Sequence, residues 1–252
     1  MRGGPLNKER IDKILVDRGL AGSRTKAQAM IMAGIVLVNE RRIEKPSETV
    51  LETDVVRIKE VSAVMKYVGR GGLKLEKALA EFHICPNAYV CLDIGSSTGG
   101  FTDCLLQQGA ASVTAIDAGT NQLAWKLRND PRVQVRENTN ARDLRPQDFP
   151  KRFDLAVMDV SFISATKVLP AIVPLLAPLG RIIVLIKPQF EAGRAEVGKG
   201  GIIKDPAVHR RVVEEVNSFA VGLGLTVAGT MESPILGAEG NKEFLSLYEA
   251  GK

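Results

Sequence analysis

The segment from Ala88 to Phe101 limits this chain to a small group of folds. An apolar run over 88–92 continues into Asp93 and Ile94, and a loop with three glycines and three hydroxyl residues follows before a helical pattern begins. A buried strand, a loop of small residues and a helix N-terminus allow the polar groups of a ligand to approach the backbone closely. The segment therefore predicts a site for a nucleotide-like cofactor.

Strand and helix patterns alternate through the rest of the chain. Hydrophobic periodicity predicts strands over 89–94, 112–117, 133–137, 154–159, 181–187, 225–231 and 242–248, and helices over 73–82, 99–108, 121–128, 165–177 and 206–222. The most apolar of these strands are expected to be buried on both faces, which is typical of a mainly parallel sheet covered by helices. No helical pattern separates the last two strands, so we expect the final strand to run antiparallel. The pattern predicts an α/β fold with a Rossmann-like seven-stranded sheet.

The first sixty residues form a separate, smaller pattern. Helices are predicted over 7–18 and 23–33, and strands over 35–39 and 50–58. The residues expected in its core are Ile11, Ile14, Leu15 and Ile31. This pattern predicts a compact α+β unit.

Positive charge is concentrated in this unit. The chain has a formal net charge of +5, and residues 1–39 carry seven Lys or Arg against three acids. Such asymmetry is typical of a module that binds a polyanion, although a solvated helix face with balanced charges explains it equally simply. Charge alone leaves both interpretations open.

Cysteine usage and the N-terminal sequence argue against a secreted or membrane-spanning protein. Cys85, Cys91 and Cys104 are odd in number and lack the paired spacing of a zinc site, so we expect buried free thiols in a reducing cytosol. The N-terminus has no signal-peptide pattern, and the apolar stretch over 168–180 is too short to span a bilayer and contains three prolines. We expect a cytoplasmic protein with no metal site and no stable membrane insertion.

The motifs of the first unit resemble a known family. They are Arg10-Ile11-Asp12-Lys13-Ile14-Leu15, Gly19-Leu20, Ser23-Arg24-Thr25-Lys26-Ala27 and the segment 33–39. In this order they resemble an S4-type RNA-binding domain. The resemblance implies that basic side chains contact the phosphates of structured RNA, and such contacts fix position more than they read sequence. The residues expected to make these contacts are Lys8, Arg10, Arg24, Lys26 and Lys45.

Asp117 narrows the choice of cofactor. It ends the second predicted strand of the larger sheet, 22 residues after Gly95. This spacing suits a carboxylate that accepts hydrogen bonds from two ribose hydroxyls, although a strand-end aspartate can also simply cap a turn. NAD fits this much, but the glycine loop departs from the G-x-G-x-x-G spacing of dehydrogenases. The seven-strand pattern with a terminal helix-free pair favours S-adenosylmethionine (SAM).

Four charged residues fall where such a sheet exposes its ligand-binding edge. Lys74 lies on the helix before the first strand, Asp159 and Lys187 end the fourth and fifth strands, and Glu243 lies near the start of the last. A salt bridge that only closes the domain would explain any one pair. The set resembles the Lys-Asp-Lys-Glu tetrad of FtsJ-like ribose 2′-O-methyltransferases.

Resemblance extends over nearly the whole chain. With an S4-type unit before an FtsJ-like one, the sequence is similar to the TlyA family, whose members carry the names hemolysin and ribosomal RNA 2′-O-methyltransferase. Matching segments are Gly69-Arg70-Gly71-Gly72-Leu73-Lys74-Leu75, Asp159-Val160-Ser161-Phe162-Ile163-Ser164, Leu185-Ile186-Lys187-Pro188-Gln189-Phe190-Glu191 and Gly240-Asn241-Lys242-Glu243-Phe244. The resemblance implies an S4-type domain over 1–61, a linker over 62–72 and a methyltransferase domain over 73–252.

The resemblance also implies a cofactor, a substrate and site residues. SAM is the implied methyl donor, and a cytidine of large-subunit ribosomal RNA, free or within a ribosomal subunit, is the implied acceptor. The residues expected around the cofactor are Asp93, Gly95, Ser96, Ser97, Thr98, Gly99, Gly100, Phe101, Asp117, Asn140, Ala141 and Phe162. Phe162 is equally well explained as a core residue.

The chemistry gives each member of the tetrad a hypothetical role. A ribose 2′-hydroxyl is a poor nucleophile while protonated, so oxygen, methyl and sulfur must be aligned and one proton removed. We expect Lys187 to remove or steer that proton and Asp159 to orient its amine. Lys74 would then hold the ribose or its phosphate, and Glu243 would brace the two lysines.

Three other functions remain to be weighed. A SAM methyltransferase acting on a small molecule or a protein would not need Lys74 and Glu243. A membrane-active hemolysin would need an apolar span or an amphipathic lytic helix, and the sequence shows neither pattern. A non-catalytic RNA-binding protein would be expected to lack the tetrad.

Overall fold

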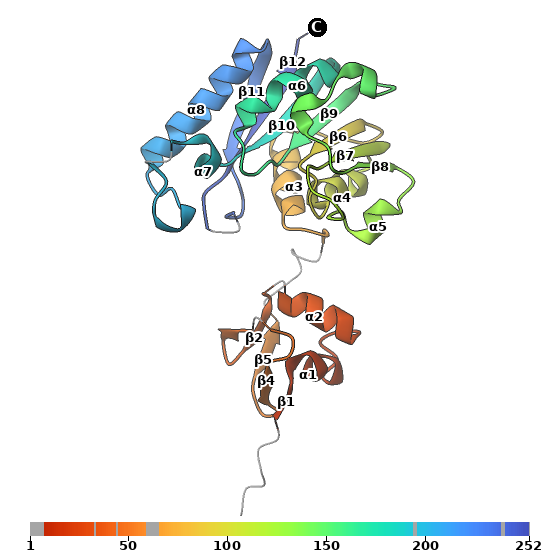
Figure 1. The fold of residues 1–252 in the computed structure, drawn as a ribbon, viewed down its shortest axis with the longest axis vertical. Coiled ribbons are helices and arrows are strands. Elements are labelled where there is room, and N and C mark those ends of the chain that lie inside the picture. The colour runs from red at the N-terminus through yellow and green to blue at the C-terminus, as the bar shows by residue number, and fades with distance from the viewer. Residues whose placement is uncertain are drawn as a thin grey trace, which may run out of the picture. The chain divides into compact units, whose positions relative to one another are not determined.

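The computed structural model describes residues 8–32, 34–43, 45–58, 66–193, 196–237 and 240–251. They form two compact units, Met1–Ala63 and Val64–Lys252, shown in Figure 1. Tyr67 is buried in the core of the second unit. The second half of the segment 62–72, interpreted from sequence as a linker, therefore packs with that unit.

The second unit is built on the seven-stranded, mainly parallel sheet that the sequence predicts. Its strand order is β11-β12-β10-β9-β6-β7-β8, and β12 pairs antiparallel with both β10 and β11. The strands are β6 (Val90–Ile94), β7 (Ser112–Ile116), β8 (Val133–Arg136), β9 (Phe153–Met158), β10 (Leu176–Ile186), β11 (Leu225–Glu232) and β12 (Phe244–Ala250). The α/β fold class and the antiparallel final strand are confirmed.

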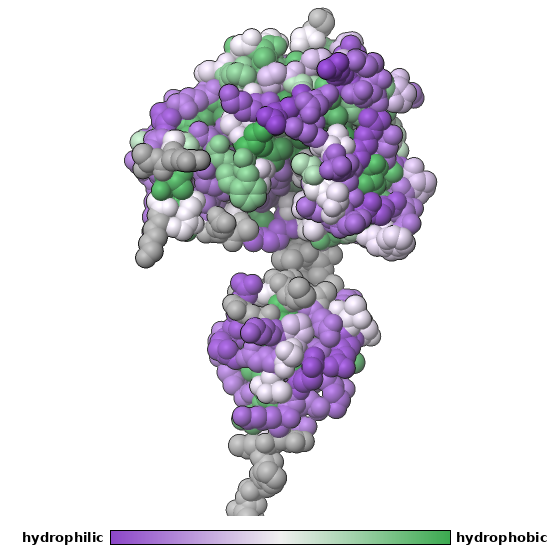
Figure 2. Space-filling model, in the orientation of Figure 1, coloured by the Kyte–Doolittle hydropathy of each residue, from purple (hydrophilic) through white to green (hydrophobic). Residues whose placement is uncertain are grey.

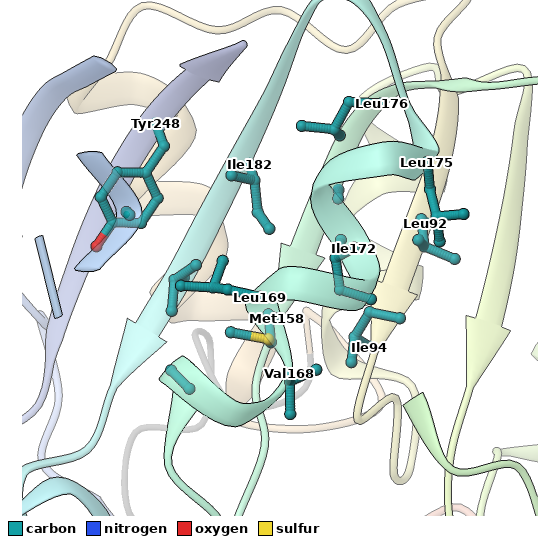
Figure 3. Packing of buried hydrophobic residues seen from close by; sticks show 14 of the residues in the cluster. Leu92, Ile94, Met158, Val168, Leu169, Ile172, Leu175, Leu176, Ile182 and Tyr248 are labelled. Carbon is teal, nitrogen blue, oxygen red and sulfur yellow. The ribbon is translucent and has the colours of Figure 1, made fainter. Parts of the chain in front are cut away.

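Helices cover both faces of this sheet (Figure 1). The α-helices are α3 (Gly71–Glu81), α4 (Gly100–Gln107), α5 (Trp125–Arg128), α6 (Leu169–Ile172), α7 (Pro188–Glu191) and α8 (Pro206–Gly222). Because side chains alternate along a strand, Leu92 and Ile94 of β6 pack with α6 in one core, whereas Cys91 packs with α3 and α4 in the other. Figure 3 shows the first of these cores. Burial on both faces explains why these strands are almost continuously apolar.

The predicted helix over 165–177 is wrong. The structure has a 3₁₀ turn (Ala165–Lys167), the short helix α6 and a second 3₁₀ turn (Val173–Leu175), and β10 already begins at Leu176. Pro170 and Pro174 interrupt the segment because proline lacks an N–H and clashes with the preceding turn. The predicted helix over 121–128 shortens to α5, and Cys85 is exposed rather than buried.

The first unit is the predicted small α+β unit, with differences in its strands. It contains β1 (Lys8–Arg10), α1 (Ile11–Asp17), α2 (Arg24–Met32), β2 (Val36–Val38), β3 (Arg41–Arg42), β4 (Thr49–Leu51) and β5 (Val56–Ile58). The helix predicted to begin at residue 7 begins only at Ile11, because residues 8–10 pair with β4 as a strand. The strand predicted over 50–58 is two strands, β4 and β5, in different sheets. The predicted core residues are buried together, which confirms them.

Candidate active site

The glycine loop joins β6 to α4 and requires glycine at two positions. Gly95 has φ +79°, and a Cβ added there would lie 2.4 Å from the carbonyl oxygen of Asp159. Gly99 has φ +97°, and Leu127 occupies the space that its Cβ would need. Residues with a side chain rarely adopt such φ values, so both positions favour glycine for its backbone conformation as well as for lack of space. The loop is therefore packed closely between the end of β9 and the segment around α5.

A cavity of about 570 Å³ lies beside this loop at the carboxyl ends of the parallel strands. Of the predicted site residues, its lining includes Gly95, Ser97, Asp117, Asn140, Ala141, Asp159 and Phe162. Ser96 is buried. The remaining predicted loop residues, Thr98, Gly99, Gly100 and Phe101, lie outside the lining and build the loop and the start of α4. Six of the twelve predicted cofactor residues thus meet at one cavity, together with the predicted catalytic residue Asp159.

Asp117 follows β7 and holds two turns together at the cavity. Its Oδ2 accepts a hydrogen bond from the backbone N–H of Ser97 at 2.7 Å, and its Oδ1 accepts one from Gly119 at 2.7 Å. Each carboxylate oxygen can accept a further hydrogen bond. The carboxylate therefore links two turns, and both of its oxygens keep capacity for a further hydrogen bond at the cavity.

Asp93 lies under the loop and is fully buried. Its Oδ2 accepts a hydrogen bond from the Thr102 hydroxyl at 2.6 Å, while Oδ1 has no partner among the described residues. Burial raises the pKa of Asp93 to about 7 because a charged carboxylate is costly away from water. An unpaired buried carboxylate oxygen is unfavourable unless a ligand or water satisfies it.

Lys187 and Asp159 form an ion pair at the rim of the cavity. Lys187 Nζ lies 2.5 Å from Asp159 Oδ1 and donates a hydrogen bond to Ser161 Oγ at 2.8 Å. The Lys187 side chain is 11% exposed and that of Asp159 is 23% exposed. Sequence reasoning did not assign Ser161 to the site; its position two residues after a strand-end aspartate was the available signal.

Lys74 and Glu243 form a second and more deeply buried ion pair. Their side chains are 9% and 4% exposed, and the Lys74 ammonium donates directly to Glu243. The ion pairs of the described residues join Glu243 to Lys74 and Lys187 to Asp159, so Glu243 does not brace both lysines as the sequence hypothesis had it. The tetrad is organised as two separate pairs.

Phe162 stands at the mouth of the cavity. It is 92% exposed, which excludes the alternative of a core phenylalanine, and its φ of +64° is unusual for a residue other than glycine. Its ring lies 5.2 Å from that of Phe190. The following loop is held by Glu191, which accepts hydrogen bonds from the Ser164 hydroxyl and from the backbone N–H of Ala165 at 2.7 Å. The loops after β9 and β10 are therefore linked at several points.

Glu137 holds a turn in the wall of the cavity, and sequence reasoning missed it. Its carboxylate accepts hydrogen bonds from the backbone N–H groups of Asn121, Gln122 and Leu123. It also forms an ion pair with Arg128 at 2.7 Å. These donors hold the pKa of Glu137 down at about 2, with the Arg128 hydrogen bond the largest cause. Glu137 thereby fixes the turn whose Gln122 lines the cavity. No sequence motif marks a carboxylate that only holds a turn.

In the first unit, the structure brings two of the predicted RNA-contacting residues together. Arg10 and Arg24 both pair with Asp12, whose side chain is fully buried, at 2.9 and 3.0 Å. The two guanidinium groups hold the pKa of Asp12 well below its usual range, with the Arg10 hydrogen bond the largest cause. Lys8, Lys26 and Lys45 are exposed. The face of this unit seen in Figure 2 is largely hydrophilic.

The fold and the cavity define a class of protein. A mainly parallel sheet of this order, with a glycine loop after β6 and an acidic residue after β7, is the architecture of SAM-dependent methyltransferases. A solved SAM-dependent methyltransferase from Mesorhizobium loti shares the fold at 15% identity, with a TM-score of 0.53 over 69% of this chain and 96% of that one. Over residues 67–249 the chain matches the FtsJ-like methyltransferase family model, and over residues 9–56 the S4 domain model.

The chain belongs to the TlyA family of FtsJ-like methyltransferases with an S4 domain. It is 46% identical over 237 residues to the 16S/23S rRNA (cytidine-2′-O)-methyltransferase TlyA of Mycobacterium tuberculosis, covering 94% of this chain and 88% of the relative. A Streptococcus thermophilus structure described as a hemolysin is 44% identical, with a TM-score of 0.77 over 98% of this chain and 90% of that one. The name hemolysin thus occurs within this methyltransferase family, and none of the described helices is both long and apolar enough to cross a membrane.

Proposed function

We propose that this protein uses SAM to methylate the ribose 2′-hydroxyl of a cytidine in ribosomal RNA, most simply in the large-subunit RNA. The observation that carries the proposal is the Lys187–Asp159 pair, held by Ser161 at the rim of a cavity suited to a cofactor. The RNA-binding family of the first unit and the rRNA substrate named for the Mycobacterium tuberculosis relative support the choice of RNA. A ribosomal substrate places the activity in the cytoplasm.

The residues around the cavity fit SAM in three places. Asp117 has free acceptor capacity for the ribose hydroxyls, and Asn140 and Ala141 line the part of the cavity beyond it, where the adenine would lie. Asp93 is fully buried and lies outside the cavity lining, so its unpaired Oδ1 offers a partner for the ammonium of the methionine part only where the loop above it shifts to admit the ligand. Glycine at positions 95 and 99 lets the loop pack against Asp159 and Leu127, and this packing holds the backbone of Gly95 and Ser97 at the cavity. When bound, SAM supplies an electrophilic methyl group on a sulfonium.

Lys187 is the residue we assign to proton transfer. Nζ donates a hydrogen bond to Ser161 and is ion-paired with Asp159, whose Oδ1 forms no hydrogen bond among the described residues, so Nζ keeps bonding capacity for a substrate hydroxyl. Only the neutral amine has a lone pair, so acceptance of the proton requires that form of Lys187. A positioned amine of this kind accepts or steers the proton that the 2′-hydroxyl loses as its oxygen attacks the methyl. Asp159 and Ser161 are positioning residues for that amine.

Lys74 and Glu243 have a different task. Because their pair is almost completely buried, Lys74 cannot reach a substrate phosphate without leaving Glu243 unpaired in the core. We therefore assign them to bracing: Lys74 lies on α3, and Gly71 at the start of that helix faces Asp159, with a Cβ there 3.8 Å from Oδ2. The pair fixes α3 against the strand that begins after Glu243.

The test is a transfer experiment with the complete chain. The protein is incubated with SAM labelled in the methyl group and, separately, with purified ribosomal subunits, naked rRNA and a mixture of ribosome-free proteins. We expect label only in the RNA, at a single cytidine whose 3′ linkage resists alkaline hydrolysis, because the methylated oxygen can no longer attack the phosphate. Label only on protein, or on a base rather than a ribose, contradicts the proposal.

A further inference from the structure

The loops that follow β9 and β10 are joined at two places, and the proposed function uses only one of them. That place is the contact of Lys187 with Asp159 and Ser161. The other is the contact of Glu191 with the far end of the loop after β9. Lys187 is the N-cap of the short helix α7 and Glu191 is its last residue, so both contacts belong to one structural unit.

Glu191 holds the far end of the loop after β9 through both of its carboxylate oxygens. Oε1 accepts a hydrogen bond from the backbone N–H of Ala165 at 2.7 Å, and Oε2 accepts one from the Ser164 hydroxyl. Ala165 is buried and begins a 3₁₀ turn, whose first N–H group has no partner within the turn itself. The carboxylate therefore caps this turn and ties it to α7.

The loop between the two contacts has a backbone that must be held in place. Phe162 lies near its centre with a φ of +64°, in the left-handed region that is unfavourable for residues with a side chain. Such a conformation persists only where the surrounding structure fixes it. Ser161 is the preceding residue, so the conformation that presents its hydroxyl to Lys187 depends on the contact at Glu191.

Three residues at the start and end of α7 face this loop together. Residues three and four positions apart lie on the same side of a helical turn. Lys187, Phe190 and Glu191 have this spacing, and each of them contacts the loop after β9. A shift of the loop along α7 would therefore change the distance between Lys187 Nζ and Ser161 Oγ, which is 2.8 Å.

We infer that Glu191 is a positioning residue for Lys187, because it fixes the loop after β9 against α7 and so keeps Ser161 in contact with Nζ. The inference rests on the proposed function for the role of Lys187. Burial raises the pKa of Glu191, since a charged carboxylate is costly away from water. The Ser164 hydroxyl can donate to a carboxylate or accept from a neutral group. The loop therefore needs two hydrogen-bonding atoms at position 191 rather than a charge.

The experiment compares E191A, E191Q and E196A in the full-length chain. E191A should lower kcat for methyl transfer to rRNA about 10- to 100-fold, because a small misplacement of a reacting group costs rate of this order. E191Q should lose no more than about threefold, since its amide oxygen can accept from Ala165 and its amide nitrogen can donate to Ser164. E196A is the matched control: Glu196 also accepts a backbone N–H, but from Gly193 in its own segment, at 3.0 Å.

Two further measurements separate positioning from a general loss of stability, and thermal unfolding confirms that each variant is folded. If Glu191 acts through Lys187, E191A should cause no further loss of single-turnover rate in the K187A background, because residues that act as a unit are not additive. Amide hydrogen exchange at Ala165 is measured without SAM or RNA. It should accelerate about tenfold in E191A and stay slow in E191Q.

The inference is overturned if E191A keeps the wild-type kcat, if E191Q loses as much as E191A, or if E191A causes its full loss again in the K187A background. Unchanged exchange at Ala165 in E191A would overturn it as well. Failure of the proposed function looks different, because wild type itself would then transfer no methyl group to RNA. The exchange rates at Ala165 need no transfer, so they still decide whether Glu191 holds the loop.

Discussion

The two lysine–carboxylate pairs of the second unit use the same chemistry in different surroundings. Lys74 and Glu243 are shut into the core, with side chains 9% and 4% exposed. Lys187 is 11% exposed, hardly more than Lys74, but its partner Asp159 lines the cavity and is 23% exposed, and the Ser161 hydroxyl accepts a hydrogen bond from the same ammonium. The difference teaches that the position of the carboxylate partner at the cavity, rather than residue type, decides which pair can meet a substrate.

Substitutions in the buried pair Lys74–Glu243 (the closed pair) and in the cavity-rim pair Lys187–Asp159 (the open pair) should therefore have different effects. A buried ion pair that loses one partner leaves an uncompensated charge in the core, so its loss appears in the free energy of unfolding. A pair that faces solvent on one side is worth little to stability but keeps a hydrogen-bonding direction for a reactant. Substitutions in each pair can test this separation.

The largest effect is expected for K187A on the rate of methyl transfer. Removing a positioned proton acceptor should lower kcat by about 10²- to 10⁴-fold, while the affinity for SAM and the unfolding temperature change little. Transfer to rRNA and calorimetric titration with SAM measure the two quantities. The matched control is K242A, which removes an exposed lysine paired with Glu232 at 3.0 Å. Near-normal turnover in K187A would end the assignment of Lys187.

The next effect is expected for E243A on stability. Leaving Lys74 buried without its partner should lower the free energy of unfolding by about 3 to 5 kcal/mol. E232A, which breaks the exposed pair with Lys242, should change it by less than about 1 kcal/mol. Denaturant titration of both variants gives the comparison. If E243A unfolds at the wild-type midpoint, the closed pair does not brace the domain.

Much of this comparison could be foreseen from the sequence, but its central feature could not. Strand-end positions identified Asp159 and Lys187, because parallel strands bring their carboxyl ends to one edge. The pairing partners depend on where α3 and the segment before β12 cross that edge, and no local pattern contains this information. For the same reason the sequence hypothesis had Glu243 brace both lysines.

Errors in the fold have equally local causes. The apolar segment over 165–177 has a helical pattern of hydrophobicity. Its prolines nevertheless break it into short turns, and its last residues belong to strand β10. Glu137 and Ser161 escaped notice because a carboxylate that binds backbone N–H groups and a serine in a loop look ordinary in sequence. Patterning reveals elements with repeated spacing, whereas single polar contacts emerge only from tertiary structure.

A smaller effect is expected at Asp117, on the open side of the cavity. D117A removes the acceptors for the ribose hydroxyls as well as the link between Ser97 and Gly119, so SAM affinity should fall about 10- to 100-fold. Calorimetric titration measures the loss. D143A is the control, because Asp143 is exposed, near in sequence to Asn140, and outside the cavity lining. Equal affinities in D117A and wild type would remove Asp117 from the cofactor site.

Asp93 extends the comparison to pH, because it is a carboxyl group buried like Glu243 but without a cationic partner. Burial raises its pKa to about 7, so the folded protein keeps this group protonated at a pH where the unfolded chain has lost the proton. The contribution of Asp93 to the free energy of unfolding is therefore greatest at a pH below its pKa in the unfolded chain, which is near 4. It declines as the pH rises and is lost above about pH 7. In denaturant titrations at several pH values, D93N should not show this decline in the free energy of unfolding.

Cofactor binding should reverse the preference of Asp93 for its proton. If the free Oδ1 receives the ammonium of SAM, only the ionised carboxylate binds well, so affinity should rise about fivefold to tenfold between about pH 6 and pH 7.5. The amino group of the ligand itself titrates near pH 8 and affects both proteins alike, so D93N in the same buffers isolates the contribution of Asp93. We expect weaker and pH-independent binding for D93N over this interval. A D93N profile as steep as that of wild type would show that the buried carboxylate does not meet the cofactor, and Asp93 would then join Glu243 as a purely structural charge.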